Sequence, residues 1–268
     1  MEKGVALVTG AASGLGRTIA LALKEDGFFV FGTSRQADPT VAWDFPLIRL
    51  DVRSDDSVRS ALGHIRSFAG RLDVLVNNAG FRFLGAAEDT TVDEAKAVFE
   101  TNFFGAHRVT VAALPLLRAS GRASKIINVT SLSGLNALPF GSVYSASKWA
   151  FEGYSESLRH EVKSLGISVS IVEPGAIRSE KREPPHRPKE AVPAYETARQ
   201  HALEVIVRGD RTGIDTARVA DCVIRIVHRR SPKLRYRVGP DATWLPRLKW
   251  LPWSWYERGI RWRYGLDA

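Results

Sequence analysis

The sequence predicts an α/β fold: one domain built on a doubly wound parallel sheet, with a C-terminal extension rich in tryptophan and arginine. Short apolar runs alternate with segments of helical periodicity over the first two-thirds of the chain. A glycine-rich turn, residues 9–16, separates the first apolar run from the first helical segment. The length of 268 residues allows one full core and is short for two. We therefore expect the domain over 1–242 and the extension over 243–268.

The expected strands are short and apolar, as in sheets that are buried on both faces. They are residues 5–8, 28–31, 47–50, 74–76, 126–129 and 167–172. Ser54, followed by two aspartates, is typical of a helix N-terminus, and a helix over 92–117 is expected to be interrupted near Asn102. Another helix is expected over 143–164. Right-handed crossovers bring the carboxyl ends of the strands to one edge, where ligands bind in such sheets.

The composition changes after Gly175. Residues 179–214 are polar and carry prolines at positions 184, 185, 188 and 193, which predict an irregular, mobile excursion rather than a core element. Its position after the sixth strand suits a lid over a substrate site, and a disordered insertion is the alternative. A helix over 216–229 and a strand over 236–238 are expected to return the chain to the sheet.

Composition and charge exclude several classes of protein. The single cysteine, Cys222, excludes an intrachain disulfide, and the six histidines lack metal-ligand spacing, so we expect a metal-free protein of the cytoplasm. No signal peptide and no membrane-spanning run is evident. The net charge of +9 comes without a nucleic-acid-binding motif. We interpret it as an arginine-rich surface and expect no nucleic-acid partner.

The turn at residues 9–16 has the pattern of a dinucleotide site. Glycines let the backbone bend sharply and approach a pyrophosphate, and the N-terminus of the following helix supplies free N–H groups and a positive dipole end. The residues expected to contact the cofactor here are Gly10, Ser13, Gly14, Leu15 and Gly16. A purely structural turn is the alternative interpretation.

The rest of the chain carries motifs that accompany this turn. They are TGxxxGxG at 9–16, Asp51-Val52, Asn77-Asn78-Ala79-Gly80, Asn102, Ser131, Tyr144 with Lys148, and Pro174-Gly175. This set, over roughly residues 4–238, resembles the short-chain dehydrogenase/reductase family, which implies a Rossmann-fold oxidoreductase acting on CH–OH groups with a nicotinamide cofactor. Residues 134–140 and 152–159 look like the branch that contains 17β-hydroxysteroid and retinol dehydrogenases.

The resemblance also implies further contacts to the cofactor. They are Asp51 and Val52 at the adenine, Asn78, Ala79 and Gly80 after the fourth strand, Tyr144 and Lys148 at the nicotinamide ribose, and Pro174, Gly175 and Ile177 at the carboxamide. All of them follow expected strands or lie on the helix after the fifth strand, at the edge where a ligand is expected.

The end of the second strand favours NADP over NAD as cofactor. NAD enzymes place an acidic residue there to hold the ribose 2′-hydroxyl, whereas this chain has Ser34 followed by Arg35. A guanidinium can pair with a 2′-phosphate, which a carboxylate would repel. Arg17, just beyond the glycine turn, adds positive charge. A surface role for Arg35 is the alternative.

Four residues form the expected catalytic group. Tyr144 and Lys148 lie four apart on one helix face, and a free tyrosine, which titrates near pH ~10, becomes a better acid–base catalyst beside an ammonium group. Ser131, after the fifth strand, can donate to the substrate oxygen as negative charge grows on it. By the family resemblance, Asn102 holds a water that links Lys148 to solvent. An unrelated surface pair is the alternative for an isolated Tyr–Lys match.

Apolar residues near Tyr144 predict a lipophilic carbonyl or alcohol as substrate. The candidates for the wall of the cleft are Leu135, Leu138 and Phe140, together with Phe81 and Phe83. The same residues can instead simply pack the wall. By resemblance, the long helices about 94–118 and 144–164 pair subunits into a homodimer or homotetramer.

The extension, 243–268, holds five of the seven tryptophans, interspersed with arginines and a lysine. We expect it to pack on the domain, over the mouth of the cleft, or against a partner subunit. Contact with a membrane interface is the less favoured hypothesis, because Pro246 and Pro252 argue against one long amphipathic helix. For the whole chain, a non-catalytic NADP(H)-sensing scaffold is the alternative function, disfavoured because Tyr144 and Lys148 are both present.

Overall fold

The computed structural model describes residues 3–37, 40–121, 123–178 and 184–266. Its centre is a seven-stranded, all-parallel sheet of strand order β3-β2-β1-β4-β5-β6-β7. The strands are Val5–Val8 (β1), Phe29–Ser34 (β2), Leu47–Arg49 (β3), Val74–Asn77 (β4), Ser124–Val129 (β5), Ile167–Pro174 (β6) and Arg235–Val238 (β7). The order reverses at β1, so the predicted doubly wound Rossmann-like sheet is confirmed, with its switch point between β1 and β4.

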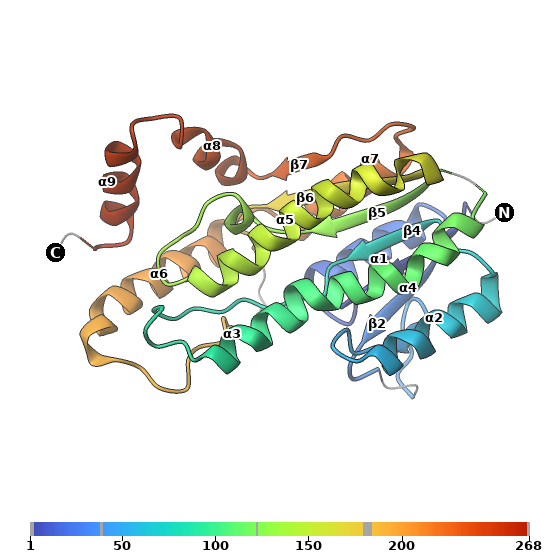
Figure 1. Cartoon of the computed structure of the whole chain (residues 1–268), viewed down its shortest axis with the longest axis horizontal. Coiled ribbons are helices and arrows are strands. Elements are labelled where there is room, and N and C mark those ends of the chain that lie inside the picture. The colour runs from blue at the N-terminus through green and yellow to red at the C-terminus, as the bar shows by residue number, and fades with distance from the viewer. Residues whose placement is uncertain (1–2, 38–39, 122, 179–183, 267–268) are drawn as a thin grey trace.

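Helices cover both faces of the sheet. They are Gly14–Glu25 (α1), Asp55–Ala69 (α2), Val92–Phe99 (α3), Gly105–Ala119 (α4), Ser142–Val162 (α5), Glu196–Thr212 (α6), Thr216–His228 (α7), Pro240–Leu248 (α8) and Trp253–Arg263 (α9). Helices α1 and α7 pack together on one face, and α2, α4 and α5 line the other (Figure 1). Each face has its own apolar cluster, which is why the central strands are buried along their length.

Local signals in the sequence fix the helix boundaries. Ser54 accepts a hydrogen bond from the Ser57 amide and begins α2, as predicted. Thr91 and Glu94 form a reciprocal capping box at the start of α3. The predicted interruption near Asn102 is a π-helical turn, Glu100–Phe104, between α3 and α4. Such turns widen the backbone locally and redirect one side chain inward.

The segment 179–214 differs from the predicted irregular excursion. Residues 179–183 lie outside the described residues, but residues 196–212 form the 17-residue helix α6. The four prolines all precede this helix, and Pro193 stands in the short turn that leads into it. The helix has a narrow apolar face that its polar composition obscures in the sequence. Ala202 on that face is fully buried, while residues on the opposite side are exposed.

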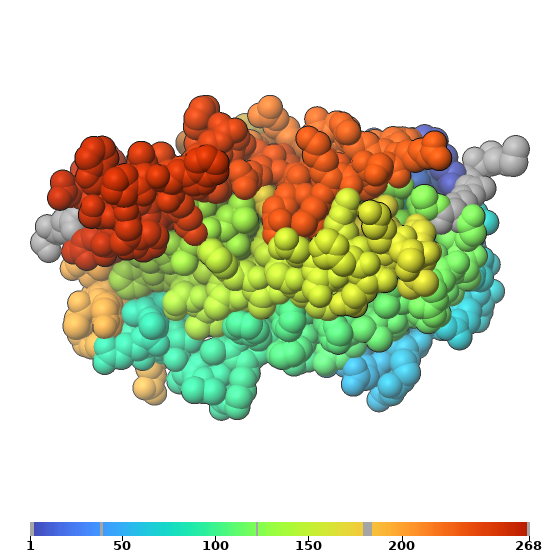
Figure 2. Space-filling model, turned by 45° about the horizontal axis from the view of Figure 1, so that its top comes forward, coloured from blue at the N-terminus to red at the C-terminus, as the bar shows by residue number. Residues whose placement is uncertain are grey.

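The C-terminal extension forms two short helices, α8 and α9, at the end of the molecule towards which the strands point (Figures 1 and 2). Helix α8 begins at Pro240, so the expected boundary between 242 and 243 falls inside a helix. Pro246 lies within α8 and Pro252 precedes α9, so the chain turns between the two helices. No helix within the described ranges is long and apolar enough to cross a membrane.

Candidate active site

The glycine-rich turn leads from β1 into α1 through two residues with left-handed backbone, Gly10 at φ 67° and Gly14 at φ 52°. Gly16 lies directly against the turn, since a Cβ there would overlap the Gly10 carbonyl oxygen and lie 2.5 Å from Asn78 Nδ2. By contrast, a Cβ on Gly14 would meet nothing within 4 Å. The turn is therefore tight on its inner side and open on its outer side, as a phosphate cradle requires.

The N-terminus of α1 is left without a side-chain cap. Ser13 occupies the N-cap position and makes no capping hydrogen bond, whereas Ser54, Thr91 and Asp215 cap α2, α3 and α7. Ser13 and Gly14 are exposed, and Leu15 packs partly against the apolar cluster beneath the helix. The first N–H groups of α1 and its positive dipole end are thus presented at the switch point, where a pyrophosphate fits.

A hydrogen-bond brace holds β1 against the residues after β4. Thr9 Oγ1 accepts from the backbone amides of Asn78 at 2.9 Å and Ala79 at 3.0 Å. Asn78 Nδ2 donates to the Thr9 carbonyl at 3.0 Å and to that of Gly10 at 3.3 Å. The sequence singled out Asn78 and Ala79 but not the Thr9 hydroxyl, which is the centre of this brace.

At the carboxyl end of β2, Ser34 Oγ accepts from the Gln36 amide at 3.2 Å, and Arg35 is exposed. Arg17, expected to add positive charge here, forms an ion pair with Asp44 at 2.9 Å. Its charge is therefore matched by a carboxylate within the chain, and Arg35 is the exposed cation next to Ser34.

Asp51 and Val52 lie just beyond β3. Both oxygens of the Asp51 carboxylate bind Arg53, with Nε at 3.0 Å and Nη2 at 2.7 Å from the nearer oxygen. This hydrogen bonding, opposed by partial burial, lowers the pKa of Asp51. Val52 is buried against Gly105, the first residue of α4, where a Cβ would lie 2.6 Å from Val52 Cγ2. Arg53 is a residue that the sequence did not single out.

Asn102 connects the π-helical turn to the strand-end loop and to α5. Its Oδ1 accepts from the Phe81 amide at 3.0 Å, and its Nδ2 donates to the Phe81 carbonyl at 3.0 Å and to Ser147 Oγ at 3.3 Å. A Cβ on Gly80 would lie 2.9 Å from Asn102 Oδ1 and 3.7 Å from Lys148 Nζ. Gly80 therefore lies between the amide group and the ammonium group that the sequence predicted to act together.

Lys148 is 5 % exposed, and its Nζ donates to the carbonyl oxygen of Val129 at the end of β5, at 3.2 Å. The same Nζ lies 6.0 Å from the ring centroid of Tyr144, one helical turn earlier on α5. Burial lowers the pKa of Lys148, and the charges of Tyr144 and Glu152 oppose that shift. The predicted pair thus shares one face of α5, and the hydrogen bond to Val129 fixes the position of the lysine.

Ser131 begins the short 3-10 turn 132–134, which packs along α5. Its Oγ accepts from the Ser133 amide at 3.1 Å, so the oxygen is oriented while its proton remains available to donate elsewhere. The serine follows β5, the strand whose end also accepts from Lys148. The structure therefore brings Asn102, Tyr144, Lys148 and Ser131 to the carboxyl edge of β4 and β5.

A buried group of charged residues behind Lys148 was not predicted from the sequence. Glu152, on α5, accepts from Thr130 Oγ1 at 2.6 Å and from Arg235 Nε at 3.2 Å. Glu173, on β6, lies 3.3 Å from Arg235 Nε and 3.4 Å from Arg237 Nε. Burial, with the nearby Glu152 charge, raises the pKa of Glu173 to about 7 against the effect of the two arginines.

The turn after β6 is held by contacts to the neighbouring strand β7 and to the start of α8. Gly175 donates to the Val238 carbonyl at 2.9 Å, and the Ala176 amide donates to Asp241 Oδ2 at 2.6 Å. Pro174 is the last residue of β6, and Ile177 is buried. No side chain fits at Gly175, because a Cβ there would overlap the Asp241 carboxylate. Asp241 is a further residue that the sequence did not single out.

Helix α6 closes the side of the site beyond α5. Leu138 and Phe140 pack against an apolar cluster of Leu84, Ala202 and Tyr264. Phe140 has φ 59°, unusual for a residue with a side chain, and its ring lies 6.3 Å from that of Tyr195. Of the other residues predicted for the wall, the Phe81 ring contacts His186 at 4.6 Å, Phe83 is buried, and the backbone carbonyl of Leu135 accepts from Lys249.

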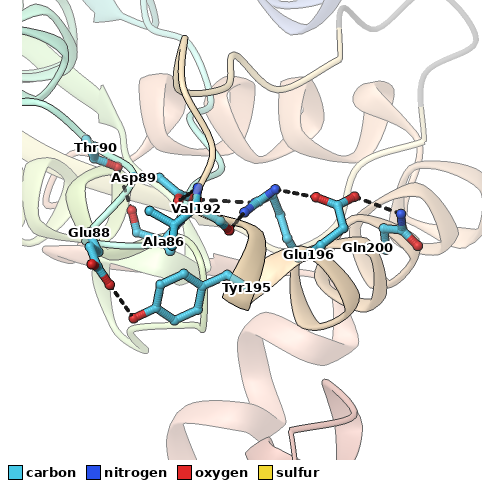
Figure 3. A network of polar contacts seen from close by, with 9 residues as sticks. Ala86, Glu88, Asp89, Thr90, Val192, Tyr195, Glu196 and Gln200 are labelled. Atoms are coloured by element: carbon cyan, nitrogen blue, oxygen red, sulfur yellow. Dashed lines mark hydrogen bonds and ion pairs between the residues drawn. The ribbon is translucent and has the colours of Figure 1, made fainter.

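A polar network fixes the start of α6 to the loop after β4 (Figure 3). The fully buried Asp89 carboxylate accepts from the Val192 amide at 2.8 Å and from Arg199 Nε at 3.2 Å. Tyr195 donates to the Glu88 carboxylate at 2.9 Å. Helix α6 is therefore held at its N-terminal end by partners about a hundred residues away in sequence.

A cavity of about 900 Å³ lies between the turn after β6, α6 and the C-terminal helices. Among its lining residues are Ala176, Val205, Ile214, Asp241 and Trp262. Tyr144 is not among the described residues that line it. The cavity is therefore separate from the predicted catalytic side chains and lies on the side of the turn at Ala176. It is a space between α6 and the C-terminal extension at the ligand-binding edge of the sheet.

Comparison with known proteins agrees with this arrangement. A family model described as short chain dehydrogenase matches residues 4–189. A 3-ketodihydrosphingosine reductase from Bacteroides thetaiotaomicron is 35% identical over 272 residues, which cover 99% of this chain and 100% of that protein.

Solved structures are similar over almost the same length. A short-chain dehydrogenase from Streptomyces avermitilis is 34% identical with a TM-score of 0.82, covering 97% of this chain and 99% of that one. A metagenomic short-chain oxidoreductase, solved in complex with NADP, is 26% identical with a TM-score of 0.69, covering 88% and 97%. With 97% of this chain covered, the similarity to the Streptomyces avermitilis protein reaches into the C-terminal extension as well as the sheet.

Proposed function

Because the chain belongs to the short-chain dehydrogenase/reductase family, an oxidoreductase family that uses a nicotinamide cofactor, we propose that it interconverts a lipophilic carbonyl compound and its alcohol with NADP(H). The observation that carries the proposal is the buried Lys148 ammonium, 6.0 Å from the Tyr144 ring at the end of β5. A cation fixed beside a phenol is suited to acid–base chemistry on a substrate oxygen.

Each catalytic side chain has a separate task in the proposed reduction. A bound nicotinamide supplies hydride to the carbonyl carbon. Ser131 donates a hydrogen bond to the carbonyl oxygen as it gains negative charge, and Tyr144 transfers its proton to that oxygen to complete the alcohol. Lys148, held by the Val129 carbonyl, stabilises the phenolate that remains. Asn102 positions the loop at Phe81, and we propose that a proton returns from solvent beside it. Oxidation of an alcohol runs these steps in reverse.

The cofactor fit is supported by the shape and charge of the turn after β1. The open outer side at Gly14 and the uncapped N-terminus of α1 suit a pyrophosphate. Arg35, beside Ser34 and without an acidic residue in the position that NAD enzymes use, favours a 2′-phosphate and hence NADP over NAD.

The substrate class is inferred from the apolar side of the site. Leu138 and Phe140, which precede Tyr144 in the chain and are backed by α6, are proposed as the apolar wall. Segment 179–214 is proposed to act as the substrate lid through α6. The relative from Bacteroides thetaiotaomicron is named for 3-ketodihydrosphingosine, a long-chain ketone. That ketone is therefore the first substrate to test.

Two further expectations accompany this proposal. We infer a homodimer or homotetramer formed through α4 and α5, since Val111 on α4, Trp149 on α5 and Phe104 directly before α4 leave apolar surface exposed. The alternative of a cofactor-sensing scaffold is disfavoured by the fixed Lys148–Tyr144 pair, which cofactor binding alone does not need.

The test is NADPH oxidation by the pure protein against a panel of ketones that includes 3-ketodihydrosphingosine. We expect turnover, and a loss of about 10²-fold or more in kcat for Tyr144→Phe with unchanged NADPH binding. Tyr154→Phe, on the same helix, is the matched control and should retain activity. Equal rates for Tyr144→Phe and the parent would contradict the mechanism, and NADPH binding without turnover on any ketone would favour the scaffold.

A further inference from the structure

The C-terminal extension exposes an unusual set of large apolar side chains, here called the tryptophan surface. Its members are Trp244, Leu248, Trp250, Leu251, Trp253, Trp255 and Trp262, which are 43–92% exposed. Single exposed apolar residues are ordinary in proteins, but a cluster of this kind marks a contact surface. The segment forms a continuous projection at one end of the molecule (Figure 2).

The tryptophan surface is held outward by side chains that anchor the opposite side of the extension. Tyr256 is buried and its hydroxyl accepts from Asn136 Nδ2 at 2.9 Å, and Tyr264 is buried in the cluster beside α6. Tyr256 and Ile260 on α9, and Tyr264 directly after it, are spaced four apart and face inward. Trp255 and Trp262 are seven apart and lie together on another, exposed face.

The charges around this surface favour an anionic partner. Between residues 244 and 263 the basic side chains are Arg247, Lys249, Arg258, Arg261 and Arg263, against the single acidic Glu257. The Arg247 guanidinium lies 4.8 Å from the Trp244 ring centroid, so cation and aromatic ring are directly adjacent. Tryptophan with arginine suits the boundary between anionic headgroups and acyl chains.

A second basic region adjoins Trp244. A cavity of about 580 Å³ beside it is lined by Arg218, Arg225 and Arg237, with Asp221 as the acidic residue. A twofold interface between two copies of this chain over this surface would place the same excess of cations on both sides, which is unfavourable. An anionic bilayer instead supplies opposite charge to the exposed Arg218 and Arg225, whereas Arg237 already pairs with Glu173.

From the exposed rings and the excess of cations, we propose that α8 and α9 dock the protein on the surface of an anionic phospholipid bilayer. Helix α9 has 11 residues and lies on the membrane rather than crossing it. Trp262 and Arg263 also line the 900 Å³ cavity, so docking brings that cavity to the lipid surface. Delivery of a lipophilic substrate from the bilayer into this cavity rests on the proposed function, whereas docking on the bilayer does not.

The test is sedimentation of the full chain with vesicles of phosphatidylcholine alone or with one-third phosphatidylglycerol. We expect strong pelleting with the anionic vesicles and weak pelleting with the neutral ones. Trp250→Ser/Trp255→Ser should partition at least about tenfold more weakly, and Arg258→Gln should weaken binding to anionic vesicles only. The matched control is Val92→Ser/Leu165→Ser, which removes two exposed apolar side chains elsewhere and should pellet like the parent.

A second measurement needs no substitution. Brominated acyl chains quench tryptophan rings that enter the bilayer, so vesicles containing them should reduce the emission of the unmodified protein. No pelleting and no quenching with anionic vesicles would overturn the proposal. The proposal would also be overturned if the parent did not bind vesicles and Trp250→Ser/Trp255→Ser had a lower oligomeric mass than the parent. The surface would then be an interface between copies. Vesicle binding is read without turnover, so an inactive protein that still docks would contradict only the proposed function.

Discussion

Lys148 and Glu152 occupy successive turns of α5, and both are only 5 % exposed. The Glu152 charge opposes the effect of burial on Lys148 and favours its ammonium form. Glu152 is in turn held by Thr130 and Arg235. It touches no expected position of substrate or cofactor, so it is a positioning residue that acts through the lysine.

The first prediction follows from this pair. Glu152→Gln keeps the hydrogen bond to Thr130 within reach but removes the carboxylate, so the pKa of Lys148 should fall further and the ammonium should be lost at lower pH. We expect the alkaline limb of the kcat/KM profile to move to lower pH. Glu156→Gln, which alters the exposed partner of the same Arg235, is the control. An unmoved alkaline limb in Glu152→Gln would show that the carboxylate does not act through Lys148.

The second prediction concerns stability and pH at Glu173. Its pKa is about 7 in the folded chain, above the value of about 4.3 for an unfolded glutamate, so the folded state holds the proton more tightly. The resulting stability is present below pH ~4.3 and is lost as pH rises through 7, by about 3.5 kcal/mol in all.

Glu173→Gln has no such titration. Its free energy of unfolding should therefore increase relative to the parent by about 3 kcal/mol between pH 4 and pH 8. Urea denaturation at several pH values measures the difference, with the exposed Glu156→Gln as control. A constant difference across this range would mean that Glu173 titrates alike in the folded and unfolded chains.

The third prediction concerns the glycine turn. Gly16→Ala places a methyl group against the Gly10 carbonyl and Asn78, so we expect a loss of about 2 kcal/mol in stability and much weaker NADPH binding. Gly63→Ala is the control, because it lies in α2 with open space around it and should stabilise the helix by about 0.5–1 kcal/mol. Denaturation and fluorescence titration with NADPH measure both effects, and normal NADPH affinity in Gly16→Ala would contradict this account of the turn.

The fourth prediction separates the two arginines near the ribose. Arg35→Ala should weaken NADPH binding by at least about tenfold and change NADH binding little, because only NADPH carries the 2′-phosphate. Arg17→Ala should have a smaller effect, since Arg17 already pairs with Asp44. Titrations of both variants with both cofactors measure this, and equal losses for NADPH and NADH in Arg35→Ala would remove the basis for the NADP preference.

The parts that sequence reasoning predicted are those that depend on local pattern. Apolar runs predicted the strands, and the spacing of Tyr144 and Lys148 predicted a shared helix face that the structure contains. Ion pairs between distant segments left no such pattern, as with Arg17 and Asp44 or Glu173 and Arg235. Their charges look like ordinary surface residues until the fold brings them together.

Helix α6 was missed because its composition is polar, and the ion pair that holds it supplies the last prediction. Asp89 and Arg199 are 110 residues apart, yet the carboxylate is fully buried and the guanidinium side chain is 11% exposed. Burial raises the pKa of Asp89, but hydrogen bonds from Val192 and Ala86 and the pairing with Arg199 outweigh it, and the net pKa is lowered. The stability from this carboxylate is therefore present above its unfolded pKa and is lost in acid.

Arg199→Met leaves the buried Asp89 carboxylate without its cation, so we expect a loss of about 3 kcal/mol in the free energy of unfolding at pH 7. Amide hydrogen exchange in α6 should accelerate, and β1 and β4 should remain the slower-exchanging elements, as in the parent. The control is Gln200→Met, which removes only an exposed hydrogen bond to Glu196 on the same helix. If α6 exchanges in Arg199→Met as slowly as in the parent, the ion pair does not hold this helix over the site, and its proposed role as a lid needs another anchor.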